Sequence, residues 1–254
     1  MSGMRLITIP MSHYCEKARW GLVRLGLPYT EERHLQGFHY LPTLWASGSR
    51  KVPVLIDGRN VVSDSTAILR HLDAYAPPAA RLYPEDAALR ERVEALEDRL
   101  DEVLGVESRR WVYFHYLTKP DEALEIASQG APAGERVLFQ ALFPIFGAML
   151  RRGLEVTREN VEKGLARSRA IVAETDALLA EGSGALLGER FSAADLALAC
   201  MLAPLVLPSH YGIRLPTLDE APEAMRSTVR EFRATRSGAY VLRLFETERT
   251  RSRR

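Results

Sequence analysis

The sequence predicts an α/β domain with the element order β-α-β-α-β-β-α, followed by an all-α domain. Short apolar runs alternate with helical patterns up to about residue 75. A proline-rich stretch at residues 76–80 then interrupts the chain, and only helical periodicity remains beyond it. We therefore expect a first domain at residues 1–78, a linker at residues 79–84 and a second domain at residues 85–254.

The first strand and the first helix meet at Ser12. Residues 4–9 form an apolar run, which Pro10 ends because proline has no N–H to donate to a sheet. Residues 15–25 then carry apolar side chains at helical spacing. Ser12 lies in the turn between them, where free N–H groups and the helix dipole stabilise an anion such as a thiolate. Serine is also a preferred N-cap, so capping alone is an alternative role.

The rest of the first domain follows from turn and cap signals. A second strand is predicted at residues 29–35, and a short helix near residues 42–46. Two apolar runs around Asp57-Gly58 predict a β-hairpin. Asp64 and Ser65 then open a helix that runs to Tyr75. A helical crossover requires parallel pairing of the first two strands, whereas the hairpin is antiparallel.

The second half of the chain carries helical patterns throughout. Ser192 and Asp195 form a capping box with a structural role, and the residues after it are apolar nearly all round, which predicts a buried helix. The arginine-rich end, residues 249–254, is expected to be a disordered, solvated tail. Helices are predicted at residues 86–117, 135–152, 158–179 and within 218–245, with a loop or short helix at 118–134.

Composition excludes several classes of function. The 254 residues include 34 basic and 33 acidic side chains, so charge gives no reason to expect nucleic acid or a membrane as a partner. No uninterrupted apolar run approaches the roughly 18 residues of a membrane span, and the N-terminus lacks a signal-peptide pattern. Cys15 and Cys200 are far apart and the histidines are scattered, so we expect no metal site and a cytoplasmic location.

Two short motifs bring the first domain close to a known family. The element order, Val52-Pro53 before a strand and Asp64-Ser65 at a helix start resemble the thioredoxin-like domain of the glutathione transferases. The resemblance implies that the Val52–Pro53 peptide is cis and that the Val52 backbone pairs with the cysteinyl part of glutathione. It also implies that Asp64 and Ser65 hold the γ-glutamyl end of this substrate.

The resemblance also covers the residues just before Val52 and the turn at Ser12. Arg50 and Lys51 match basic residues that meet the glycyl carboxylate of glutathione, with solvated surface charges as the alternative. Ser12 matches the serine of the tau- and phi-like classes, which donates a hydrogen bond to the glutathione thiolate. Tyr14 is a rival donor or a wall of the site. Cys15 is either structural or a reactive thiol.

These observations favour an enzyme that conjugates glutathione to a small hydrophobic electrophile, a detoxification activity that needs no metal. The alternatives are a non-catalytic glutathione-fold binding protein, and a glutathione-dependent thiol reductase or peroxidase that uses Cys15. Trp111 and His115, in an aromatic cluster at residues 111–116, are candidates for the second-substrate pocket, although helix packing is an alternative role for them.

The resemblance also implies a homodimer, with the thioredoxin-like domain of one subunit against the helical domain of the other. The helix that starts near Asp86 carries a mixed-sign set of charges that could pair with its own copy, and the helix at Ser65 could supply the opposing face. The charges in this set are Arg90, Arg92, Glu94, Glu97 and Arg99.

Overall fold

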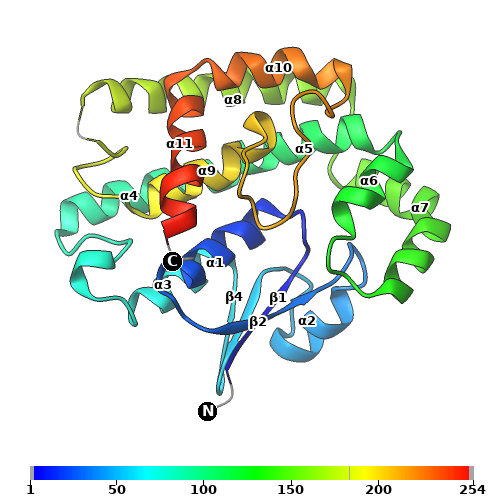
Figure 1. The fold of residues 1–254 in the computed structure, drawn as a ribbon, viewed down its shortest axis with the longest axis horizontal. Coiled ribbons are helices and arrows are strands. Elements are labelled where there is room, and N and C mark those ends of the chain that lie inside the picture. The colour runs from blue at the N-terminus through cyan, green and yellow to red at the C-terminus, as the bar shows by residue number, and fades with distance from the viewer. Residues whose placement is uncertain (1–2, 183, 252–254) are drawn as a thin grey trace.

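A computed structural model describes residues 3–182 and 184–251, with a small sheet beneath layers of helices (Figure 1). Strands β1 (Met4–Thr8), β2 (Tyr29–Arg33), β3 (Val54–Asp57) and β4 (Asn60–Ser63) form one sheet in the order β2-β1-β3-β4. Strand β1 is parallel to β2 and antiparallel to β3, and β3 is antiparallel to β4. The predicted crossover and hairpin are therefore confirmed.

Three helices surround this sheet, namely α1 (His13–Arg24), α2 (Tyr40–Ser47) and α3 (Ser65–Asp73). Helices α1 and α3 pack on one face, because Leu22 of α1 and Ile68 of α3 share a buried cluster with Leu6 and Leu55 of the strands. The other side of α1 contacts the helical half of the chain, in particular α9. Helix α1 is consequently buried between the two halves.

The second half is helical, as predicted. A short 3-10 turn, η1 (Pro78–Ala80), precedes it. The predicted long helix consists of α4 (Ala87–Arg99), the π-helical segment η2 (Leu100–Leu104) and α5 (Gly105–Tyr116) without a break. The remaining helices are α6 (Pro120–Ala127), α7 (Ala133–Gly153), α8 (Arg158–Ala180), α9 (Ala193–Val206), α10 (Glu223–Arg233) and α11 (Arg236–Arg251).

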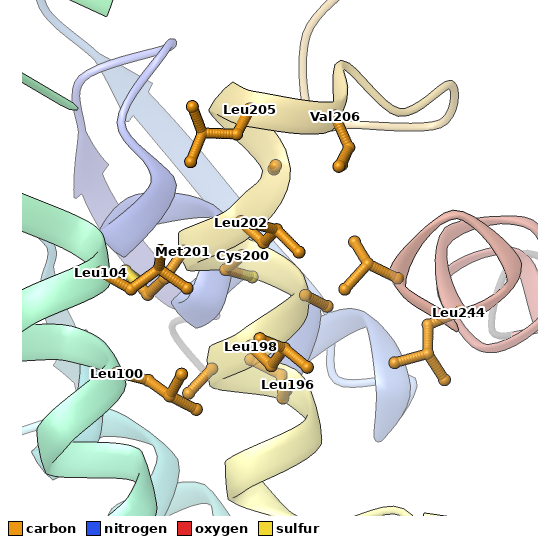
Figure 2. Close-up of a cluster of buried hydrophobic side chains, with 14 of the residues drawn as sticks. Leu100, Leu104, Leu196, Leu198, Cys200, Met201, Leu202, Leu205, Val206 and Leu244 are labelled. Atoms are coloured by element: carbon orange, nitrogen blue, oxygen red, sulfur yellow. The ribbon is translucent and has the colours of Figure 1, made fainter. Parts of the chain in front are cut away.

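Helix α9 forms the centre of the helical half. Figure 2 shows its side chains pointing both toward Leu100 and Leu104 and toward Leu244 of α11. The predicted capping box is present, with the Ser192 N–H donating to Asp195 Oδ2 at 2.8 Å. Asp195 Oδ1 also accepts hydrogen bonds from the Leu186 N–H and from the Tyr240 hydroxyl. Asp195 therefore joins three segments in the core and has a structural role.

Two sequence predictions about surface charges are wrong. Arg249 does not belong to a solvated tail, because α11 continues to Arg251 and the buried Arg249 Nε donates to Glu16 Oε1 at 2.8 Å. Figure 1 places this end of α11 beside α1. Glu97 does not belong to an exposed mixed-sign surface, because it is fully buried against Lys17. Both charges meet partners that are distant in the sequence. Residues 252–254 of the predicted tail lie outside the described residues.

Helix α7 is apolar on two sides. Its inward side packs Phe146 against Phe38, with ring centroids 5.9 Å apart. Its outer side leaves aliphatic side chains exposed, which are Val137, Leu138, Ile145 and Met149. Among the described residues it is the one helix long and apolar enough to cross a membrane, and 11% of its most apolar window is buried. A single helix of this kind is weak evidence for a membrane span.

Candidate functional site

A cavity of about 530 Å³ lies where the start of α1 and the segment before β3 face the helical half. One side of the cavity is polar and comes from the first domain, through Ser12, Arg50, Lys51, Val52 and Asp64. The opposite side is mainly apolar and comes from α5, α6 and α7, together with residues 204–225. The fold thus places a polar subsite and an apolar subsite in one cavity.

The position of Ser12 is compatible with both roles considered from the sequence, namely capping α1 and donating a hydrogen bond to a bound anion. Its side-chain oxygen caps α1 by accepting a hydrogen bond from the Cys15 N–H at 3.3 Å. Ser12 also lines the cavity, at the positive end of the α1 dipole. A hydroxyl group has one proton to donate in addition to the bonds that it accepts. Capping the helix therefore does not prevent Ser12 from donating to a bound anion.

Cys15 and Tyr14 are both engaged within the protein. The Cys15 side chain is 0% exposed, and its sulfur accepts the Ile9 N–H at 3.5 Å. Burial raises the pKa of the Cys15 thiol, although Arg19 and a hydrogen bond with Ser12 oppose this. The Tyr14 hydroxyl donates to the Asp101 carbonyl at 2.7 Å, and burial raises the pKa of Tyr14 to about 12. The Tyr14 ring is thus a wall of the cavity.

The segment before β3 lies at the edge of the cavity. The Val52–Pro53 peptide is cis, as the resemblance implies, and Val52 lines the cavity just before the strand begins. The Arg50 and Lys51 side chains line the same edge and are exposed. The Arg50 guanidinium lies 5.5 Å from the centre of the Tyr40 ring. The cationic side chains of Arg50 and Lys51 and the backbone at Val52 are therefore available to a ligand at this edge of the cavity.

Asp64 and Ser65 open α3 at the same side of the cavity. Asp64 Oδ1 accepts the Thr66 N–H at 2.9 Å and the Ala67 N–H at 3.2 Å, so Asp64 is the N-cap. Its φ of 83° lies in the left-handed region, an unusual conformation for a residue other than glycine. Ser65 is buried at the first helical position and is not among the cavity residues.

Helix α5 brings only part of the aromatic cluster at residues 111–116 to the cavity. Arg109, Val112, Tyr113 and Tyr116 line the cavity, whereas Trp111 and His115 do not. Trp111 is buried in the helical core, and the His115 ring packs against it at 5.2 Å. The spacing i, i+3, i+4 and i+7 from Arg109 was the available signal, because such residues share one face of a helix.

His13 is a further cavity residue that sequence reasoning did not single out. Burial, and then the charge of Arg109, lower the pKa of His13 to about 3, against a hydrogen bond to the Gly105 backbone. The imidazole is therefore neutral at physiological pH. Its Nε2 atom is buried and has no hydrogen-bond partner among the described residues. In residues 3–182 and 184–251, no group of three or more His, Cys, Asp or Glu side chains could hold a metal ion.

The fold and this site define a protein with a thioredoxin-like domain and an all-helical domain that share a two-sided cavity. The model of the glutathione S-transferase N-terminal domain matches residues 6–80, and that of the C-terminal domain matches residues 158–227. Together they match more than half of the chain, so the chain belongs to the glutathione S-transferase family. The comparison with curated proteins found no match.

Solved structures share this fold over nearly the whole chain. A glutathione S-transferase from Methylobacillus flagellatus KT with glutathione bound is 21% identical, with 94% of this chain and 98% of that chain covered and a TM-score of 0.57. The theta class glutathione S-transferase from Xanthomonas axonopodis pv. citri, also with glutathione bound, is 21% identical, with coverages of 95% and 98% and a TM-score of 0.58. The beta-etherase LigF from Sphingobium sp. strain SYK-6 is 16% identical, with coverages of 95% and 99% and a TM-score of 0.60.

Proposed function

We propose that this protein is a glutathione transferase that joins the glutathione thiolate to a small hydrophobic electrophile. The observation that carries the proposal is the shared cavity, which has Ser12 and Val52 on one side and the apolar face of α5 on the other. A thiol held beside Ser12 would face any molecule held against Tyr113 and Tyr116. Proximity of this kind turns a bimolecular reaction into an effectively unimolecular one.

The polar side of the cavity matches the charges of glutathione. This tripeptide carries a carboxylate at each end and an ammonium group at its γ-glutamyl end. Arg50 and Lys51 would receive the glycyl carboxylate, and Asp64, which lines the cavity at the capped start of α3, would receive the γ-glutamyl ammonium group. The backbone of Val52 would then pair with the cysteinyl part, as an edge strand pairs with an extended peptide.

Ser12 would act on the sulfur. A free thiol has a pKa of roughly 8.5 and is ionised to only a few per cent at pH 7. A hydrogen bond from the Ser12 hydroxyl and the positive end of α1 would both stabilise the thiolate and lower its pKa. With a chlorinated electrophile, the thiolate then forms a C–S bond and chloride departs with the C–Cl electron pair. With an unsaturated ketone, the C–S bond forms while the C=C electron pair moves to an enolate, which takes a proton from water.

The burial of Cys15 weighs against the thiol reductase alternative. A resolving or attacking thiol must be reached by a disulfide or a peroxide, whereas the Cys15 side chain is 0% exposed. Its raised pKa also keeps it in the less nucleophilic thiol form. The remaining alternative is a protein that binds glutathione and does not catalyse, and binding must be measured separately from turnover to distinguish it.

The test is a calorimetric titration with glutathione and with S-methylglutathione, followed by turnover assays with chlorodinitrobenzene and with an unsaturated ketone. We expect both peptides to bind and glutathione to be conjugated. Binding without turnover of any electrophile would favour the non-catalytic protein. No heat of binding at millimolar glutathione, together with no turnover, would overturn the proposal.

A further inference from the structure

We infer that the second substrate of this site is an electrophile that carries a carboxylate group, and that Arg109 receives that group. This inference rests on the proposed function, since it assigns the substrate class of the same cavity. It starts from a guanidinium that lines the cavity and has no acidic partner in residues 3–182 and 184–251.

Arg109 differs in this respect from its neighbour on α5 and from the cations of α1. The neighbouring Arg110 is paired with Glu107 and donates to the Leu154 carbonyl at 2.8 Å. Lys17 and Arg19, in the buried first helix, each meet carboxylates. Arg109 has only the Tyr14 ring, 5.9 Å from its guanidinium carbon, and its Nε is buried without a hydrogen-bond partner in the part of the chain that the structure describes.

The groups around Arg109 form no ion pair with it in residues 3–182 and 184–251, although Asp64 lines the same cavity. His13 is neutral, because burial and Arg109 itself lower its pKa to about 3. Tyr14 and Tyr113 are neutral phenols, since burial raises the pKa of each. Asp101, which lies near Tyr14, is already bound to Lys17 at 2.5 Å. A guanidinium remains charged at any physiological pH, so a partly buried one without a counter-ion favours an anionic ligand.

The position of Arg109 indicates that the anion belongs to the second substrate and not to glutathione. Arg109 lies on the cavity face of α5, one turn before Tyr113 and two turns before Tyr116, in the mainly apolar wall. Arg50 and Lys51 are separate cations at the edge formed by the first domain, where they suit glutathione. The second substrate would therefore have an apolar, ring-sized body along the Tyr113 and Tyr116 wall and a carboxylate at the Arg109 end.

A guanidinium can also hold the carboxylate in one orientation. Two parallel N–H groups of arginine match the two oxygens of a carboxylate, which fixes the plane of the ligand as well as its position. His13 and Tyr14, next to Arg109, belong to the first turn of α1, which Ser12 caps. A carboxylate held by Arg109 would thus orient the electrophilic carbon toward the sulfur that Ser12 receives.

The experiment compares two electrophiles that differ in this group alone, namely 4-chloro-3-nitrobenzoate and its methyl ester. In both, the thiolate forms a C–S bond at the chlorine-bearing carbon and chloride leaves with the C–Cl electron pair. Arg109→Met removes the charge. Arg109→Lys keeps the charge but lacks the two parallel N–H groups of the guanidinium. Arg110→Met is the control on the same helix. Thermal melts show that each variant is folded.

We expect Arg109→Met to lower kcat/KM for the acid by about 10- to 100-fold, which is the effect of losing a charge-assisted hydrogen bond. For the ester, kcat/KM should fall by less than about threefold. Arg109→Lys should restore part of the rate with the acid, and Arg110→Met should change both substrates equally. Equal losses for acid and ester with Arg109→Met would overturn the inference. Weaker glutathione binding with an unchanged preference between acid and ester would also overturn it, by assigning Arg109 to glutathione.

A binding measurement separates this inference from the proposed function. Nitrobenzoate and its methyl ester, which have no leaving group, are titrated into the protein saturated with S-methylglutathione. We expect the acid to bind at least tenfold more tightly than the ester, and Arg109→Met to abolish the difference. Failure of the wild type to turn over either chlorinated compound would count against the proposed function. Equal affinities for acid and ester would count against the role of Arg109.

Discussion

The Lys17 ammonium group lies 2.6 Å from Glu97 Oε1, and both side chains are fully buried where the two domains meet. The Lys17 nitrogen also lies 2.5 Å from Asp101 Oδ2. It donates to the Thr66 hydroxyl at 2.9 Å, and that hydroxyl donates to Glu97 Oε1 at 3.0 Å. Because Thr66 belongs to the first turn of α3, this network fixes the turn that Asp64 caps relative to the helical domain.

Removing Lys17 should destabilise the protein strongly. Lys17→Met leaves the buried Glu97 and the partly buried Asp101 as neighbouring carboxylates without a cation, and breaking a buried pair in this way costs about 3–5 kcal/mol. The matched control is Arg90→Met, since Arg90 and Glu94 form an exposed pair at 3.1 Å that contributes about 0.5 kcal/mol. Calorimetric or fluorescence melts should show a Tm loss of roughly 10 °C for Lys17→Met. Equal losses in the two variants would contradict this interpretation.

The attachment of α7 to β2 should weaken as the pH rises. His34 Nδ1 lies 2.6 Å from Glu135 Oε1, and its Nε2 lies 2.9 Å from Glu32 Oε1. Burial opposes the charged form, but the hydrogen bonds to Glu32 and Glu135 raise the pKa of His34 above 6.5. A pKa that is higher in the folded state adds stability below the unfolded pKa, and this stability is lost as the pH rises through the folded value.

The measurement is the Tm of the wild type and of His34→Gln at about pH 5.5 and about pH 9, values on either side of a histidine pKa. At the lower pH, we expect the wild type to have a higher Tm than His34→Gln. At the higher pH, we expect this difference in Tm to be smaller. A difference that stays constant with pH would show that His34 does not carry this dependence.

Ser12→Ala should lower the conjugation rate by about 100-fold, because losing one donor to a developing or bound anion costs that much in other enzymes. Glutathione affinity should fall much less, since the rest of the tripeptide keeps its contacts. The thiolate pKa, read by ultraviolet difference spectra, should rise in the variant. Thr157→Ala removes the cap of another helix, α8, and controls for the loss of an N-cap. An unchanged thiolate pKa in Ser12→Ala would rule out this role.

Cys15→Ser should affect stability more than activity. The thiol is buried and behaves as a small apolar side chain, so a hydroxyl in its place loses favourable packing. We expect the conjugation rate to stay within about tenfold of the wild type while Tm falls. Loss of all activity with an unchanged Tm would assign the reacting thiol to Cys15.

The protein should form a homodimer, a proposal that rests on the family resemblance and on charges along α4. Arg92 is exposed there, whereas Glu97 is not available to a partner subunit. Sedimentation velocity at tens of micromolar protein should give a mass near twice the 28.5 kDa of one chain. A single species at the mass of one chain would refute this proposal.

Local patterns in the sequence were enough to predict the order of the elements. Apolar periodicity distinguishes strands from helices, and the Asp57-Gly58 turn, the Asp64 cap and the Ser192–Asp195 box each act within a few residues. The positions near the polar side of the cavity were named mainly through the family resemblance, which the short motifs Val52-Pro53 and Asp64-Ser65 carry. They adjoin a strand end or a helix start, and such ends have free backbone groups.

The tertiary structure alone decided which face of a helix meets which neighbour. Helix α5 carries aromatic residues on two faces, and only the packing of α9 shows that Trp111 is in the core while Tyr113 faces the cavity. The sequence placed Glu97 on a surface that could pair with a second copy and Arg249 in a solvated tail, because neither has a complete set of partners nearby in the sequence. The contact between the domains buries and pairs them, since a charge is stable away from water only beside its counter-ion.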